Sequence, residues 1–305
     1  MTSLPFSETR GVVTDGGLET DLLFNHGVDL PEFAAFPLLE DPRGNRLLEA
    51  YYAAYAGVAA RAGADLLLET PTWRANPEWG EKLGYDGAAL RSANHRAVDL
   101  LRGLASSADV ERVFVSGVVG PRGDGYVPTA SAVDEAATYH SAQIATLAEA
   151  GVDLVHAMTV GTTEEAEGIV HAARSVGLPV LVSFTVETDG TLPDGTPLAD
   201  AIRRVDGSIA PDGYGINCAH PTHVTQSLDG GDWQRRIVAL RPNASTMSHA
   251  ELDEMEVLDA GDIDLLTASL TRVREQLPAV RVVGGCCGTD VSHVAAMWGV
   301  GSTPA

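Results

Sequence analysis

Short apolar runs alternate with longer amphipathic stretches along most of the chain. The apolar runs are rich in Val, Ile and Leu, and they predict eight β-strands at 12–15, 65–70, 113–119, 153–158, 180–185, 213–218, 237–240 and 280–284. Ala-rich stretches with helical spacing separate them and predict helices that include 47–61, 89–104, 131–150, 163–176 and 265–276. Continuously apolar strands that alternate with helices are typical of a parallel sheet covered on both faces.

The number of predicted strands indicates the architecture. Eight strands with connecting helices fit a closed (β/α)8 TIM barrel of the α/β class better than an open doubly wound sheet. A glycine that ends a helix before the next strand recurs at Gly63 and Gly151. No low-complexity linker divides the chain, so we expect a single domain over residues 1–305 with its core at about 11–298.

Composition and charge exclude several classes of partner and chemistry. The chain has 20 Lys and Arg against 42 Asp and Glu, and this net charge of −22 argues against a nucleic-acid or membrane partner. The start, MTSLPFSETR, lacks the pattern of a signal peptide, and no apolar run reaches the roughly 18 residues of a membrane span, so we expect a cytoplasmic protein. The only lysine, Lys82, lies in a polar segment, which argues against Schiff-base or pyridoxal chemistry.

All three cysteines lie where predicted strands end: Cys218 follows the sixth strand, and Cys286 and Cys287 follow the eighth. In a (β/α)8 barrel the carboxyl ends of the strands share one rim and form the active site. Three thiolates at that rim predict a catalytic zinc site with its fourth position open. Three buried apolar cysteines and a redox dithiol are alternatives, although the chain has no C-x-x-C. His220 and His223 follow Cys218 closely and could compete as ligands, although three sulfurs already suffice.

The cysteine pattern resembles that of the homocysteine S-methyltransferase family, over about residues 11–298. The motifs that carry the resemblance are Gly284-Gly-Cys-Cys-Gly-Thr289, Gly215-Ile-Asn-Cys218, Asp15-Gly-Gly, Val182-Ser-Phe-Thr185 and Leu192-Pro-Asp-Gly-Thr196. The resemblance implies that Cys218, Cys286 and Cys287 bind Zn²⁺ and are catalytic through it. Zinc would take the substrate thiol as its fourth ligand and deprotonate it.

The resemblance also implies where the acceptor binds. Asp15 and Gly16 match positions that contact the amino-acid part of homocysteine, and Trp73 matches an aromatic residue near the metal. After the fourth strand the family usually has a Glu that binds the acceptor's ammonium, whereas this chain has Met158, whose thioether cannot pair with an ammonium. Glu69, Glu187 or Asp15 could take over that contact, and Arg241 could meet a carboxylate. The candidate substrate-binding residues are Asp15, Gly16, Glu69, Thr70, Trp73, Met158, Asn217 and Arg241.

We therefore expect a zinc-dependent, cobalamin-independent S-methyltransferase that moves a methyl group from a small onium-type donor to a zinc-bound thiol. The expected acceptor is homocysteine, which would give methionine. Two alternatives stay open: the same chemistry on a different thiol, because of Met158, and a non-enzymatic barrel with structural zinc. The expected partners are the thiol and the methyl donor, and the sequence does not distinguish S-methylmethionine, S-adenosylmethionine and betaine. The oligomeric state, a homo-oligomer included, also stays open.

Overall fold

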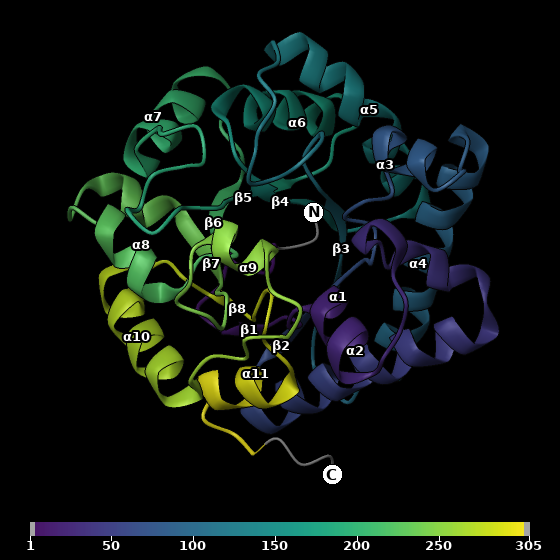
Figure 1. The fold of residues 1–305 in the computed structure, drawn as a ribbon, viewed down its shortest axis with the longest axis horizontal. Helices are drawn as coiled ribbons and strands as arrows, with labels where there is room; N and C mark the ends of the chain where they lie inside the picture. The colour runs from purple at the N-terminus through teal and green to yellow at the C-terminus, as the bar shows by residue number, and fades with distance from the viewer. Residues whose placement is uncertain (1–3, 302–305) are drawn as a thin grey trace.

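The computed structural model of the protein describes residues 4–301, so residues 1–3 and 302–305 of the predicted domain lie outside the described part. Eight parallel strands close into a barrel in which neighbours along the chain are also neighbours in the sheet (Figure 1). The predicted (β/α)8 barrel is confirmed. The strands are β1 Val12–Val13, β2 Asp65–Glu69, β3 Val113–Val119, β4 Leu154–Val160, β5 Val180–Phe184, β6 Gly213–Asn217, β7 Ile237–Arg241 and β8 Val282–Val283.

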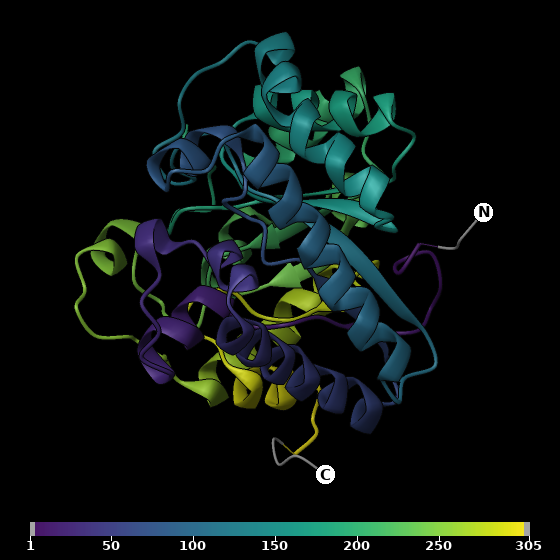
Figure 2. The ribbon, with the colours of Figure 1, turned by 90° about the vertical axis from the view of Figure 1, so that its right-hand side faces the viewer.

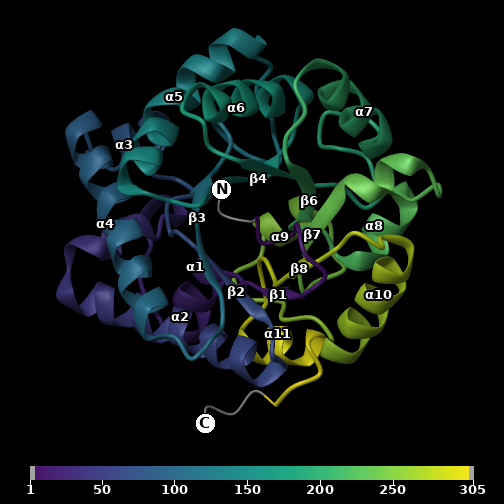
Figure 3. The ribbon, with the colours of Figure 1, turned by 180° about the vertical axis from the view of Figure 1, so that it is seen from behind.

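Helices surround the barrel between successive strands (Figure 3). They are α1 Leu18–Thr20, α2 Pro42–Ala62, α3 Pro77–Lys82, α4 Gly87–Ser107, α5 Val133–Ala150, α6 Thr163–Ser175, α7 Leu198–Ser208, α8 Pro221–Ser227, α9 His249–Asp253, α10 Ile263–Gln276 and α11 Val291–Met297. Shorter 3-10 or π turns occupy Asp21–Asn25, Pro31–Phe33, Phe36–Glu40 and Asp232–Arg236. In the described part of the chain, no helix is both long and apolar enough to cross a membrane.

Local signals in the sequence explain where the long helices begin and end. The Asp41 carboxylate accepts a hydrogen bond from the Gly44 amide, and Pro42 follows as the first helical residue of α2. The predicted glycine stops are confirmed, because Gly63 ends α2 with φ +60° and Gly151 ends α5 with φ +87°. Glycine adopts this left-handed conformation without the strain that a Cβ would cause.

The barrel interior changes from apolar to polar along the strands. Successive side chains of a strand point to opposite faces, so residues two apart share the interior. Leu67 belongs to the apolar cluster inside the barrel, and Glu69 lies two residues further along β2. In β4 the same spacing places Leu154 in that cluster, followed by His156 and Met158. Polar groups therefore gather toward the carboxyl ends of the strands, where α9 and the segments after β1 lie (Figure 2).

Candidate active site

A cavity of about 440 Å³ lies at the carboxyl ends of the strands, a volume typical of small-molecule sites. The barrel brings all the residues predicted for the site to the lining of this cavity. They are Asp15, Gly16, Glu69, Thr70, Trp73, Met158, Asn217, Cys218, Arg241, Cys286 and Cys287. They come from segments up to 272 residues apart (287 − 15), which only the closed sheet brings together.

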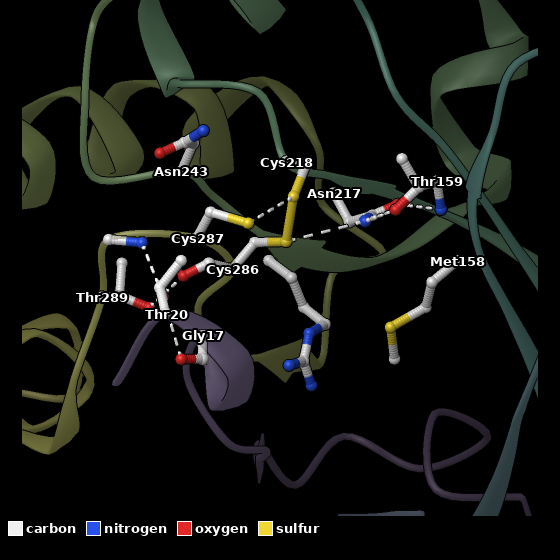
Figure 4. The surroundings of a disulfide bond; sticks show 12 residues. Gly17, Thr20, Met158, Thr159, Asn217, Cys218, Asn243, Cys286, Cys287 and Thr289 are labelled. Carbon is white, nitrogen blue, oxygen red and sulfur yellow. Dashed lines mark hydrogen bonds between the residues drawn. A yellow bond between two sulfur atoms is a disulfide. The ribbon is translucent and has the colours of Figure 1, made fainter. Parts of the chain in front are cut away.

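The three cysteine sulfurs form one cluster. Their Sγ atoms all lie within 4.8 Å of one another, and in the described residues this is the only group of three or more Cys, His, Asp and Glu side chains that could hold a metal ion. Cys218 and Cys286 form a disulfide, and the free Sγ of Cys287 lies 3.6 Å from that of Cys218 (Figure 4). Three thiolates are therefore available together only after a two-electron reduction of this bond. His220 and His223 lie outside the cluster.

Backbone contacts hold the two cysteine segments side by side. The Cys218 amide donates to the Arg241 carbonyl over 3.0 Å, and the Cys286 amide donates to the Pro242 carbonyl over 2.8 Å. Gly288 follows the cysteine pair with φ +77°, and a Cβ there would lie 2.8 Å from the carbonyl oxygen of Asp259. A side chain at position 288 would therefore displace the loop that carries Cys286 and Cys287.

The turn after β1 is bonded to the same cysteine loop. The Gly17 amide donates to the Thr289 carbonyl over 3.0 Å, and the Gly288 amide donates to the Thr20 hydroxyl over 3.1 Å. The Thr20 hydroxyl in turn donates to the Gly17 carbonyl over 3.0 Å (Figure 4). A Cβ at Gly17 would lie only 2.4 Å from the Cys286 carbonyl oxygen. The Asp-Gly-Gly motif thus allows two backbones to meet, and no sequence signal singles out Thr20.

Arg241 lies at the floor of the cavity, between two carboxylates. Its Nη1 is 2.5 Å from Oδ1 of Asp15 and forms a second ion pair with Glu69. It also donates to the Thr14 hydroxyl over 2.9 Å, while Nη2 donates to the Gly16 carbonyl over 3.0 Å. Protein groups therefore satisfy Nη1 and Nη2, whereas Nε is buried without a hydrogen-bond partner among the described residues. In this arrangement the guanidinium holds the ends of β1, β2 and β7 together.

The charged network continues from Glu69 across the barrel. Glu69 pairs with Nδ1 of His156, and Nε2 of His156 is hydrogen-bonded to the Ser183 hydroxyl at 2.6 Å. Burial opposes ionisation of Glu69, but Arg241 and His156 outweigh it and lower the pKa of Glu69. Desolvation raises the pKa of Asp15 to about 7, against the pull of Arg241. At neutral pH the ionised partner of Arg241 is consequently Glu69, while Asp15 is partly protonated.

Asn217 fixes the end of β4. Its Oδ1 accepts from the Thr159 amide over 2.8 Å, and its Nδ2 donates to the Thr159 hydroxyl over 2.8 Å and approaches Sγ of Cys286 at 3.8 Å. Thr159 has φ +61°, which is strained for a β-branched residue. The preceding Met158 is 7% exposed and lies at the edge of the site (Figure 4), and its carbonyl accepts from Nε1 of Trp73 over 3.2 Å.

Two further contacts at the cavity involve His249, which the sequence did not single out, and Thr70, which was predicted to bind substrate. His249, from α9, is hydrogen-bonded through Nε2 to the Cys218 carbonyl at 2.6 Å and through Nδ1 to Glu187 at 2.9 Å, and Tyr126 stacks on its ring. The hydroxyl of Thr70 accepts from the Val118 amide over 2.8 Å, so it ties β2 to β3 at the cavity wall. His249 follows no predicted strand and belongs to no motif, and nothing in the pattern indicates it.

Residues 12–299 match the homocysteine S-methyltransferase family. One similar protein is the homocysteine S-methyltransferase of Escherichia coli K12, 25% identical over 94% of each chain. Another is betaine–homocysteine S-methyltransferase 1 of Danio rerio, 26% identical over 94% of this chain and 72% of that protein. The fold is similar to that of the metallated form of the E. coli homocysteine methyltransferase, with a TM-score of 0.75 and 23% identity over 97% of this chain and 99% of that chain.

Proposed function

The chain belongs to the homocysteine S-methyltransferase family, and on this premise we propose that it methylates a thiol, homocysteine, held at Cys218, Cys286 and Cys287. One observation carries the proposal: the three sulfurs converge within 4.8 Å at the wall of a cavity large enough for small molecules. The methyl donor is proposed to be a small onium compound. The curated relatives are transferases, which disfavours a barrel with a purely structural metal.

The cysteine cluster fits a thiophilic divalent cation, and zinc is the ion we propose. Soft thiolate ligands select zinc over the harder magnesium and calcium ions, and three protein ligands are the number found in catalytic zinc sites. Without a cation, desolvation raises the pKa of Cys287 to about 12, so its thiol stays protonated at neutral pH. When bound, zinc would supply the positive charge that lowers the pKa of both the cysteines and the acceptor thiol.

The residues around the cysteines hold the reactants in position and keep water away from them. The buried network of Arg241 and Glu69 forms a rigid floor, and Asn217 holds the end of β4 against Cys286. Trp73 and Tyr126 line the cavity and offer aromatic faces to a positively charged donor. In the reaction the acceptor sulfur forms a bond to the methyl carbon, and the bond from that carbon to the donor heteroatom breaks. The electron pair stays on the donor, which loses its positive charge.

A matrix of acceptors and donors tests the proposal. Reduced, zinc-loaded protein is incubated with homocysteine or cysteine and with S-methylmethionine, S-adenosylmethionine or betaine, and the methylated thiol is measured by mass spectrometry. We expect methionine from homocysteine with at least one donor and without added cobalamin or nicotinamide. Cys287→Ala should lose both bound zinc and activity, whereas Ser141→Ala, on the exposed face of α5, should keep both. A zinc-loaded protein that methylates neither thiol with any donor would contradict the proposal.

A further inference from the structure

Two charged side chains of the cavity have no ion-pair partner. Glu19, in α1, and Arg74, after β2, line the same cavity as the cysteines. The charges at the cavity floor, on Asp15, Glu69 and Arg241, are paired with one another. In the part of the chain that the structure describes, no opposite charge lies within ion-pair distance of Glu19 or Arg74. Each is the other's strongest charged neighbour, and Asp124 and Glu32 also act on Arg74 from further away. The cavity therefore presents one negative and one positive group that remain open to a ligand.

Glu19 is half-buried, and its carboxylate lacks a direct counter-ion. Desolvation raises the pKa of Glu19, and the groups that oppose this are its own backbone amide and the charges of Arg74 and Arg241. A desolvated carboxylate without a partner is costly, and a bound ammonium that donates hydrogen bonds to it would remove that cost. Glu19 therefore has the properties of a cation-binding residue.

Arg74 is held in place by aromatic rings instead of a carboxylate. Its guanidinium carbon lies 3.8 Å from the centre of the Trp79 ring and 5.0 Å from that of Trp73. One guanidinium nitrogen donates to the Glu32 carbonyl, and Nε is buried without a hydrogen-bond partner among the described residues. A guanidinium that is stacked and only partly hydrogen-bonded presents a preformed fork for a carboxylate.

Both side chains are tied to the reacting end of the cavity. The Gly17 amide and the Thr20 hydroxyl are hydrogen-bonded to the cysteine loop and flank Glu19 on both sides, so its position is fixed relative to the sulfurs. Arg74 directly follows Trp73, whose indole donates to the Met158 carbonyl. An open anion and an open cation near the thiol site match the two charges of an amino acid.

We propose that Glu19 and Arg74 bind the α-amino-acid head group of the thiol acceptor, Glu19 its ammonium and Arg74 its carboxylate. Glu19 then supplies, from the first βα turn, the negative charge that Met158 cannot supply at the end of β4. The assignment rests on the proposed thiol methylation, because it needs the acceptor sulfur at the cysteine cluster. It favours homocysteine over thiols that lack a charged head group.

Binding without a methyl donor tests the assignment, since donors with their own amino-acid group are then absent. Reduced, zinc-loaded protein is titrated by calorimetry with homocysteine, with mercaptobutanoate, which lacks the ammonium, and with aminopropanethiol, which lacks the carboxylate. Glu19→Gln should weaken homocysteine and aminopropanethiol about tenfold to hundredfold, the range for a lost charge-assisted hydrogen bond, and mercaptobutanoate by less than about threefold. Arg74→Gln should weaken homocysteine and mercaptobutanoate to a similar extent and spare aminopropanethiol.

Control variants distinguish the loss of a specific contact with the ligand from a general effect of charge or of folding. Asp253→Asn removes an exposed carboxylate at the cavity edge, Arg46→Gln removes an exposed cation on α2, and both should bind all three thiols as the parent does. Zinc content and Tm are measured for every variant, and Glu19→Asp should retain more ammonium selectivity than Glu19→Gln. If Glu19→Gln weakens all three thiols equally, or none, while the parent binds them, the head-group assignment is wrong and thiol methylation stands. A zinc-loaded parent that binds no thiol overturns both proposals.

Discussion

Replacing Arg241 by Met removes the guanidinium that Asp15 and Glu69 share at the cavity floor, while keeping most of the side-chain volume. The exposed fractions of the three side chains are 7% for Arg241, 6% for Asp15 and 2% for Glu69, so water cannot take over the lost contacts. Breaking a buried ion pair on one side costs about 3–5 kcal/mol, because the remaining charge stays desolvated. This is a large part of the roughly 5–15 kcal/mol by which native proteins are stable.

A second substitution separates the unpaired charge from the lost packing. In Arg241→Met with Glu69→Gln, the carboxylate that is ionised at neutral pH is also gone, and Asp15, whose pKa is about 7, can stay protonated. We therefore expect the double variant to recover about 2–3 kcal/mol relative to Arg241→Met alone, a coupling typical of residues in one network. The loss in the single variant should be larger at pH 8 than at pH 6, because unpaired carboxylates bind protons as the pH falls.

Urea unfolding followed by circular dichroism measures these differences. With a denaturant dependence of about 3 kcal/mol per M, the midpoint for Arg241→Met should fall by roughly 1–1.7 M. A loss below about 1 kcal/mol in the single variant, or a double variant less stable than the single one, would refute the view that Arg241 acts as the shared counter-ion. In that case a role of Arg241 in binding a substrate carboxylate would regain support.

Three further predictions concern other parts of the chain. Asp290 and His293 pair at the start of α11, and this contact lowers the pKa of Asp290 and raises that of His293. The pair therefore stabilises the fold between about pH 4 and 6.5, and it weakens as the pH leaves this window on either side. Asp290→Asn, which keeps the N-cap, should therefore lower the free energy of unfolding by about 1 kcal/mol near pH 5.5 and by less at pH 8.5; an equal loss at both values would contradict the ion pair. Gly168→Ala places a Cβ 2.5 Å from a side chain of α5 and should lower the free energy of unfolding by about 1–3 kcal/mol. Gly103→Ala has open space around the new Cβ and should not destabilise the protein. Equal Tm values for the two variants would contradict this packing. Met158→Glu should change the kcat/KM ratio of homocysteine to mercaptobutanoate by less than about threefold, because α1 already provides the carboxylate; a tenfold increase would show that the ammonium lies at β4.

Periodicity and composition were sufficient to predict the architecture and the place of the cysteines. The alternation of apolar runs and helices predicts eight strands, and a closed barrel then places Cys218 beside Cys286 without further information. β1 and β8 are shorter than predicted. At their ends, a Cβ on Gly284 would lie 2.4 Å from the Asp15 carbonyl oxygen, so the two backbones approach closely and leave the regular ladder.

The partners of the charged residues could not be predicted from the sequence. Period-two alternation places Glu69 inside the barrel, but its pairing with Arg241, 172 residues away, depends on the side-chain directions of two strands. Glu19 has the pattern of an ordinary polar residue in a helix, and Arg74 belongs to none of the motifs. That their charges lack ion-pair partners follows only from the structure, in which the neighbouring Asp15, Glu69 and Arg241 pair with one another. The disulfide between Cys218 and Cys286 likewise depends on redox state, which a sequence does not encode.

X-ray absorption at the zinc edge, recorded on the reduced protein with and without homocysteine, counts the sulfur atoms that bind the metal. We predict three sulfur neighbours at about 2.3 Å in the free protein, from Cys218, Cys286 and Cys287, and four after homocysteine is added. A zinc shell with fewer than three sulfurs, or one that stays the same when homocysteine is added at saturating concentration, would contradict this prediction.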